Sequence, residues 1–293
     1  GPLQMTGHRL PIKGTDMIHL PKLTIGLALV AGLSACGTTY QLPELGAAQT
    51  QQASQMFTAA QQQGARPALS TSAAEQRFRR VSSRIKAAGG KYCLALTAEQ
   101  KDFNCNVNVA IDYKMSQRNA YFTYDNSQPI IRISMPMMRD TQSDDEVAFI
   151  LGHEYGHLIG RHIEKQQQQA IAGAIILGTI TAAANSYSAS YGGYYDDAAV
   201  AQSVAAGAAL GTQAYSQSYE LESDTLGTRI ASAAGYDPVQ GAMFFARPEA
   251  AKTSAGNLSF WGTHPPDEKR LATVIATSDE IKAEVGLRKS VTQ

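Results

Sequence analysis

The clearest alternation of apolar and polar positions in this chain lies between residues 143 and 160. Five apolar residues recur there at the three-and-four spacing of a helix with one buried face, namely Val147, Ile150, Leu151, Leu158 and Ile159. Just before them, Ser143 and Glu146 have the spacing of a capping box, in which each side chain accepts a hydrogen bond from the other residue's backbone N–H. The pattern predicts a helix that begins just after Ser143 and turns one side toward the core.

Shorter patterns predict one amphipathic helix and three strands before this helix. The helix spans Ala73 to Ala88, and the strands span Val107 to Ile111, Ala120 to Tyr124 and Pro129 to Ser134. Pro129 and Pro136 bracket the last strand, which predicts an edge position where an extended peptide could pair. The fold class expected from these elements is α+β, mostly helical with a small β-sheet.

Residues 170–215 form an insertion that is rich in Ala, Gly and Tyr and is uncharged except for Asp196 and Asp197. Its apolar part, Ala170 to Ala184, is shorter than the roughly 20 residues that span a bilayer. Two interpretations remain: core helices joined by a Gly/Tyr loop, or a reduced hairpin that covers a cleft, contacts a membrane surface or mediates self-association.

The N-terminal residues have the composition of a processed leader. Gly1 to Gln4 is interpreted as the remnant of a cleaved tag, and residues 1–35 as that remnant plus a lipoprotein signal peptide. Lys22 precedes an apolar run that ends in Leu33-Ser34-Ala35-Cys36, which resembles a lipobox. The sequence therefore predicts a lipid on Cys36. Gly37 in place of Asp after this cysteine resembles the Gram-negative rule for sorting to the periplasmic side of the outer membrane.

The remaining composition indicates a tether followed by one domain. Residues 36–72 are rich in Gln, Ala, Thr and Ser, which is typical of a flexible tether with one short helix, and residues 73–293 form the domain. Equal numbers of basic and acidic residues, 25 of each, give no basic surface for nucleic acid. With Cys36 assigned to lipid, Cys93 and Cys105 are expected to form a disulfide, with two buried thiols as the alternative.

The candidate chemistry lies in the middle of the predicted central helix, where residues 153–157 read His-Glu-Tyr-Gly-His. Two imidazoles four residues apart share a helix face and bind one metal ion. Glu154, one residue further round, reaches a metal-bound water. The motif predicts a hydrolytic zinc site formed by His153 and His157; the alternative is a buried helix whose histidines only form hydrogen bonds.

Gly152, Gly156 and Gly160 repeat every four residues along the same helix. Each glycine costs about 1 kcal/mol relative to alanine in a helix interior. Another chain segment must therefore approach this stripe, and it is either a neighbouring helix or the backbone beside the metal site.

A third zinc ligand is expected downstream, because catalytic zinc sites usually take three protein ligands. Glu220 and Asp224 share one face of a predicted helix, so Glu220 supplies an oxygen ligand and Asp224 accepts the second ring N–H of a ligating histidine. Glu222 points elsewhere on a regular helix. The alternative for these acids is a solvated helix face. Gly235 is expected to end this helix in a left-handed C-cap, and Asp237 to start the next one.

These motifs together resemble the HtpX-like zinc metallopeptidases, a gluzincin family, and within it the periplasmic lipoprotein branch of LoiP-like and BepA-like proteins. The likeness covers roughly Ala73 to Leu287 and rests on an ordered set of elements, namely Asn119-Ala120, His153-Glu154-x-Gly156-His157, Glu220-x-x-x-Asp224, Thr263-His264-Pro265-Pro266 and Arg270. One stretch departs from the family pattern: residues 121–126 read Tyr-Phe-Thr-Tyr-Asp-Asn where relatives tend to carry a Pro-Gly-Gly turn. The details of the substrate-side loop therefore do not carry over from the family.

The resemblance implies a zincin-type domain with one Zn²⁺ per chain and assigns roles to single residues. Glu154 is the general base toward zinc-bound water. His264 either donates to the tetrahedral oxyanion or is a fourth zinc ligand in a closed resting state; the alternative from the residues alone is a helix-capping histidine, with Pro265 and Pro266 in the first turn. Arg270 holds the His264 segment by an ion pair.

The function expected on this basis is that of a lipid-anchored periplasmic zinc endopeptidase. Its expected substrates are unfolded, misfolded or misassembled envelope proteins, and its expected membrane contact is the lipid on Cys36. The alternative is a non-catalytic chaperone or assembly lipoprotein with a structural or regulatory zinc. Glu154 separates the two, because a structural zinc site has no use for a base.

Overall fold

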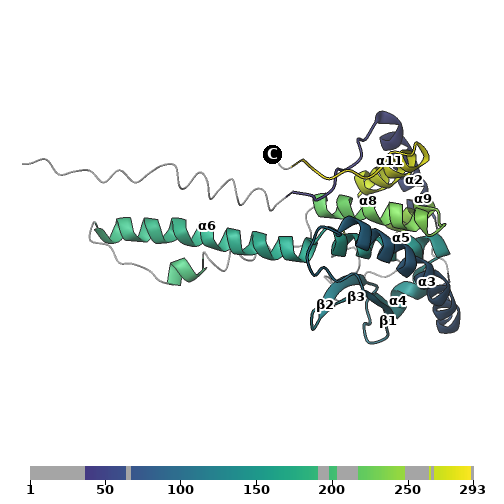
Figure 1. Cartoon of the computed structure of the whole chain (residues 1–293), viewed down its shortest axis with the longest axis horizontal. Helices are drawn as coiled ribbons and strands as arrows, with labels where there is room; N and C mark the ends of the chain where they lie inside the picture. The colour runs from purple at the N-terminus through teal and green to yellow at the C-terminus, as the bar shows by residue number, and fades with distance from the viewer. Residues whose placement is uncertain are drawn as a thin grey trace, which may run out of the picture.

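A computed structural model describes residues 37–63, 67–190, 198–202, 217–247, 264 and 267–291, and shows a helical body with one small sheet (Figure 1). The elements in chain order are α2 (Ala47–Gln61), α3 (Thr71–Leu96), β1 (Asn108–Asp112), β2 (Ala120–Asp125), β3 (Gln128–Ser134), α4 (Met135–Asp140), α5 (Asp144–Ile159), α6 (His162–Ser190), α8 (Gln217–Ala233), α9 (Pro238–Ala246) and α11 (Glu268–Lys282). The α+β prediction is confirmed.

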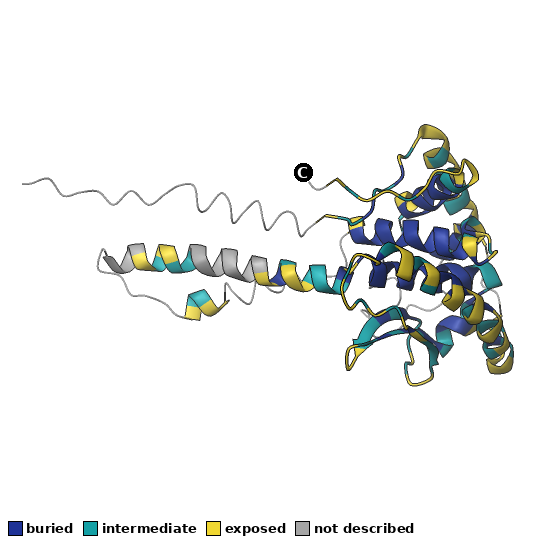
Figure 2. Ribbon diagram, in the orientation of Figure 1, coloured by how far each residue is buried: buried dark blue, intermediate teal, exposed yellow. Residues whose placement is uncertain are grey.

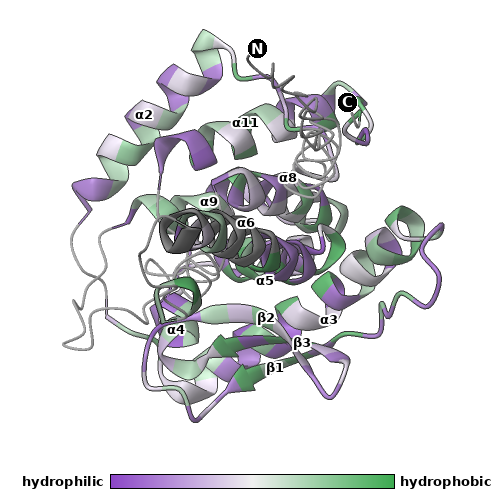
Figure 3. Cartoon of the chain, turned by 90° about the vertical axis from the view of Figure 1, so that its left-hand side faces the viewer, coloured by the Kyte–Doolittle hydropathy of each residue, from purple (hydrophilic) through white to green (hydrophobic). Residues whose placement is uncertain are grey.

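Two central helices, α5 and α8, lie side by side and are buried along most of their length (Figure 2). On one side, α11 packs on α8 and carries α2 on its outer face. On the other side, the sheet and α3 cover α5 (Figure 3). Both central helices are therefore shielded from solvent. Most of the candidate site residues lie on these two helices.

The glycine stripe of α5 faces α8. A Cβ added to Gly156 would lie 2.6 Å from the Ser223 Cα, and one added to Gly152 would lie 2.9 Å from the Gly227 carbonyl oxygen. Contacts this short are not compatible with a side chain, so the glycines let the two backbones touch. Of the two interpretations of the stripe, a neighbouring helix is the observed one, and it is the helix that carries Glu220.

The sheet has the strand order β1-β3-β2, with β1 parallel and β2 antiparallel to β3. The prediction that β3 is an edge strand is therefore wrong. Its prolines are tolerated because they lie at its ends: pairing with β1 begins only at Ile130, one residue after Pro129, and Pro136 already belongs to α4. The edge strand beside α5 is β2.

The helix boundaries follow the predicted signals with one difference. Gly235 has φ 84° after α8, and Asp237 caps the N-terminus of α9, both as predicted. At the start of α5, the Ser143 hydroxyl accepts the Glu146 N–H at 3.2 Å. The Glu146 carboxylate, however, accepts the N–H of Gln142 rather than that of Ser143, so only half of the capping box forms.

The segment expected to be a free tether is packed on the body from residue 37 onward. Tyr40 is buried and forms an isolated bridge with Lys289, and α2 buries Ala53 and Ala60. Small side chains at one face let this Gln- and Ala-rich helix lie flat on its neighbours. A composition that is typical of linkers therefore forms a helix docked on the body in this protein.

Helix α3 is longer than predicted and leads into the predicted disulfide. It continues past Ala88 through Gly89, where a Cβ would lie 2.8 Å from the Tyr155 ring, so the glycine allows α3 to pack on α5. Cys93 and Cys105 are joined, with their Cα atoms 5.7 Å apart. Closing a loop of this length stabilises the fold by about 2 to 3 kcal/mol.

The insertion begins as one long helix, α6, which leaves the body after its first turns (Figure 1). The interpretation as packed core helices is therefore wrong for this helix, and the Gly/Tyr loop at 191–197 lies outside the described residues. In the described part of the chain, no helix combines the length and the apolar character needed to cross a bilayer.

We predict that Gly156→Ala destabilises the protein by about 1 to 3 kcal/mol, because the added methyl group overpacks the contact with Ser223. Gly90→Ala is the matched control: it is also a helix-interior position, but nothing lies within 4 Å of its added Cβ. That change should instead stabilise the protein by about 0.4 to 1 kcal/mol. Urea unfolding of both variants measures the difference, and equal effects would contradict the close α5–α8 contact.

Candidate metal centre

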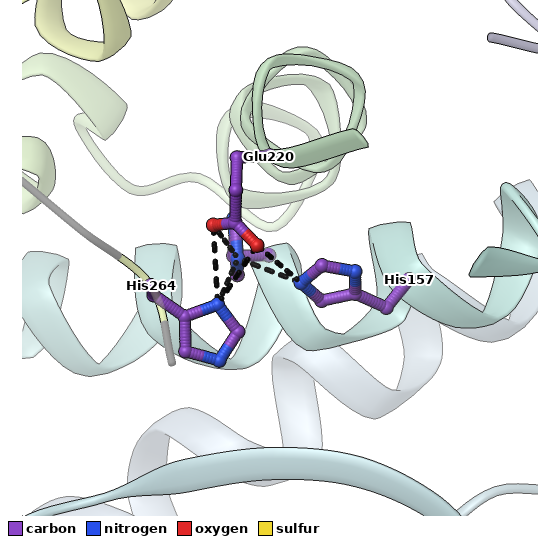
Figure 4. A group of neighbouring side chains, drawn as sticks. His157, Glu220 and His264 are labelled. Atoms are coloured by element: carbon purple, nitrogen blue, oxygen red, sulfur yellow. Dashed lines mark hydrogen bonds and ion pairs between the residues drawn. The ribbon is translucent and has the colours of Figure 1, made fainter. Parts of the chain in front are cut away.

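Four buried side chains from three parts of the chain converge on one point. His153 and His157 come from α5, Glu220 comes from the first turn of α8, and His264 precedes α11 (Figure 4). The His153 and His157 Nε2 atoms lie 3.0 Å apart, and the His264 Nδ1 lies 3.3 Å from the His153 Nε2. Both Glu220 oxygens lie 3.1 Å from the His264 Nδ1.

This spacing fits a tetrahedral metal ion. Zinc bonds to nitrogen and oxygen are about 2.0 to 2.2 Å long, so the corners of the tetrahedron are about 3.3 to 3.6 Å apart. The Glu220 carboxylate lies at a similar distance from both histidines of α5, with its Oε2 3.4 Å from the His153 Nε2 and its Oε1 3.5 Å from the His157 Nε2. The donor set of imidazoles and one carboxylate is also the one that zinc prefers in hydrolytic sites.

The formal charges around the four donors also leave room for a cation. Four buried acids, namely Glu154, Glu220, Glu222 and Asp224, surround the site. Two cations face them, Arg270 against Asp224 and Glu220, and Lys165 at 3.9 Å from Glu222. With the imidazoles neutral, as metal ligands must be, four carboxylates against these two cations leave two negative charges among the described residues, which a divalent metal ion balances.

The direction in which each donor's pKa is shifted indicates whether the donor is deprotonated and can offer a lone pair to a metal ion. Burial lowers the pKa of His157 well below its ordinary value, so its imidazole is neutral. Burial raises the pKa of Glu220, but His264 and Arg270 outweigh it and hold that pKa well below the usual range. For His153, burial lowers the pKa and the hydrogen bonds to Asp224 and Glu220 raise it, to about 9 in the metal-free protein. Metal binding must therefore displace a proton from His153.

Asp224 and Arg270 support the donors from behind. Asp224 accepts the Nδ1 hydrogen of His153 at 2.8 Å, which directs the Nε2 lone pair toward the other donors. Arg270 binds both Asp224 oxygens at 2.8 Å and donates to the His264 carbonyl at 3.1 Å. Its guanidinium lies 3.9 Å above the Phe245 ring. Arg270 therefore holds the His264 segment by a hydrogen bond to its carbonyl rather than by the predicted ion pair, and its ion pairs are with Asp224 and Glu220. The solvated-face alternative for Glu220 and Asp224 is wrong, because both are buried.

Glu154 differs from every other buried acid of the site. In the described part of the chain neither of its carboxylate oxygens has a hydrogen-bond partner at normal distance and angle, although the Phe122 backbone N–H is near enough to lower the carboxyl pKa. Burial raises its pKa. The His264 Nε2 lies 3.7 Å from the Glu154 Oε1. A buried carboxylate that is kept unpaired and raised in pKa beside metal donors is suited to accept a proton.

Two site residues were missed by sequence reasoning, His162 and Glu222. His162 Nδ1 lies 2.9 Å from the His157 Nδ1, and its Nε2 lies 2.8 Å from the Glu222 Oε2. The five-residue spacing from His157 does not place His162 on the same face of a regular helix. It arrives there because α5 stops at Ile159 and Arg161 takes the left-handed conformation, φ 56°. No local sequence signal marks that turn.

Some of the other predicted residues are not described by the structure. Cys36, Pro265 and Pro266 lie outside the described residues. The helix-capping alternative for His264 is wrong, because Asp267 caps α11 and the helix begins at Glu268.

Comparison with known proteins agrees with the geometry. Residues 75–278 match Peptidase family M48. The chain is also 27% identical to Metalloprotease LoiP of Escherichia coli (strain K12) over 188 residues, which cover 64% of this chain and 70% of that protein.

Proposed function

Because this chain belongs to peptidase family M48 and is a zinc metalloprotease, we propose that it is a lipid-anchored periplasmic endopeptidase acting on misfolded or misassembled envelope proteins. His153, His157 and Glu220 hold the zinc ion in this proposal. The observation that carries it is the convergence of these donors beside an unpaired buried Glu154. Similarity to a metalloprotease supports the activity, and the lipobox at Cys36 supports the location.

Peptide hydrolysis follows from the placement of Glu154. Zinc supplies a Lewis acid for the scissile carbonyl when it is bound. Glu154 takes a proton from the attacking water and then delivers it to the leaving amine nitrogen, so that the carboxylate is restored. Its raised pKa suits the first half of this cycle, because a carboxylate with a raised pKa is a stronger base toward water.

His264 closes the site in this conformation. Its Nδ1 lies in the donor cluster, 3.1 Å from Glu220, and its Nε2 faces Glu154. Water and a scissile carbonyl need the space that this ring fills. Of the two roles implied by the family resemblance, that of a resting ligand which must move aside fits these distances better than that of an oxyanion donor.

A substrate peptide has one edge available beside Glu154. The edge strand β2 packs on α5, with the backbone of Phe122 next to the Glu154 carboxylate. An extended peptide that pairs with β2 would pass the site, and only unfolded segments can pair in this way. The preference for misfolded proteins follows from this requirement.

The packed N-terminal segment limits how far the domain reaches from a membrane. Gly37 follows Cys36 directly, and its carbonyl oxygen accepts a hydrogen bond from Lys165 at 3.0 Å. A lipid on Cys36 would hold the body at the membrane surface rather than on a long tether. We expect Cys36→Ser to release the protein into the soluble periplasmic fraction with its peptidase activity intact, and fractionation followed by a casein assay measures both.

We predict that Glu154→Gln abolishes hydrolysis of an unfolded protein and leaves zinc content and melting temperature unchanged. The amide keeps the shape of the side chain but cannot accept the proton of water. Elemental analysis, thermal unfolding and a casein assay with and without chelator are the measurements. Turnover comparable to that of the parent protein would remove Glu154 from its role as base.

We predict that His264→Ala raises basal proteolysis, because it opens the position that the ring fills. Lys269→Ala is the matched control, an exposed position at the start of α11, and should leave the rate unchanged. Initial rates on unfolded casein decide between the two roles. A fall of roughly 10²-fold or more would instead identify His264 as an oxyanion donor.

A further inference from the structure

Behind His157, on the side away from the metal donors, a buried chain of polar groups leads to the N-terminal segment. His157 Nδ1 lies 2.9 Å from the His162 Nδ1, and His162 Nε2 lies 2.8 Å from the Glu222 Oε2. The second Glu222 oxygen accepts the Tyr40 backbone N–H at 2.6 Å. His157, His162 and Glu222 are all fully buried.

The donors and acceptors along this chain have one consistent order. The His157 Nε2 faces the metal donors and must keep its lone pair free, so the proton of a neutral His157 is on Nδ1. That N–H donates to the His162 Nδ1 at 2.9 Å, and the Ser223 hydroxyl lies 3.3 Å from the same nitrogen. With Nδ1 as the acceptor, the His162 proton is on Nε2. The His162 N–H then donates to the Glu222 carboxylate, as second-sphere acids do for ligating histidines.

The far end of the chain is held by residues that follow Cys36. Lys165 donates to the Gly37 carbonyl at 3.0 Å and to the Thr39 hydroxyl at 2.7 Å, and this docking holds Tyr40 against Glu222. The ring of His162 is stacked on Tyr219, with centroids 4.6 Å apart, so its orientation is set as well. The polar chain therefore connects the chain's first described residues to a metal donor.

We infer that His162 and Glu222 are positioning residues that orient His157 toward the metal, and that docking of residues 37–40 completes this support. The tightness with which the site holds its metal is then coupled to the segment next to Cys36. This inference rests on the proposed role of His157 as a zinc ligand. It gives His157 the support that Asp224 and Arg270 give His153.

Zinc affinity, measured by chelator competition on the full chain, distinguishes positioning from a purely structural role. His162→Phe keeps the ring and its stacking but removes the hydrogen bonds of His162 with His157, Glu222 and Ser223, and should weaken zinc binding by about 10- to 100-fold. Glu222→Gln keeps the shape and loses the charge, and should cause a smaller loss. Thr277→Val is the control: it removes a buried hydroxyl bond to Thr273 far along α11 and should lower stability without changing zinc affinity.

The role of the N-terminal segment is tested by Thr39→Val, which removes the hydroxyl that accepts from Lys165 at 2.7 Å and leaves the Lys165–Glu222 contact at 3.9 Å in place. The variant should bind zinc several-fold more weakly than the parent chain. The same change should have little further effect in a Glu222→Gln background, because it acts through Glu222. Additive losses in the double variant would overturn the coupling to residues 37–40.

The outcomes separate this inference from the proposed function. A parent chain that binds no stoichiometric zinc would overturn the ligand assignment itself. Stoichiometric zinc in the parent together with unchanged affinity in His162→Phe would overturn only the positioning role. If His162→Phe does not fold, His162→Asn replaces it. The amide oxygen of asparagine keeps an acceptor near the Nδ1 position, while the contact with Glu222 is lost. Parent-like zinc affinity in this variant would then overturn the positioning role of Glu222.

Discussion

The backbone contact between α5 and α8 is the constraint on which the site depends. The two helices touch where Gly152 meets Gly227 and Gly156 meets Ser223, at distances that leave no room for a side chain on either glycine of α5. Only at this separation does the short Glu220 side chain on α8 reach the histidines of α5. The glycines reduce the intrinsic helix propensity of α5, and the surrounding helices α3, α8 and α9 together with the sheet supply the packing that keeps it helical.

Burying so many charges is possible because nearly all of them are paired. Arg270 binds Asp224 with two hydrogen bonds and also approaches Glu220, while Glu222 accepts from His162 and from the Tyr40 backbone. Each of these contacts offsets the cost of removing the group from water. Glu154 is the exception, and an unpaired buried acid persists where chemistry requires it. Within this one buried cluster, the paired charges stabilise the fold, and the unpaired Glu154 is kept for chemistry.

The N-terminal segment and the sheet show how composition and local rules can mislead. A stretch of Gln, Ala, Thr and Ser is typical of linkers, yet the same small and polar residues form α2, whose Ala53 and Ala60 are buried. Prolines at both ends of β3 suggested an edge strand, yet pairing with β1 starts after Pro129 and leaves β3 central. In both cases a neighbouring element decided the outcome, and neither neighbour is adjacent in sequence.

The sequence by itself determined the features that depend on short spacings. The cap at Ser143, the helix through residues 153–157, the shared face of Glu220 and Asp224 and the left-handed Gly235 follow from helix geometry, which repeats within a few residues. Only the folded chain shows that β2 is the edge beside Glu154 and that His162 lies behind His157. It also places His264, which only the family resemblance assigned to the site, among the donors. Those placements depend on contacts between residues that are distant in the chain or separated by the left-handed turn at Arg161, and no local periodicity encodes them.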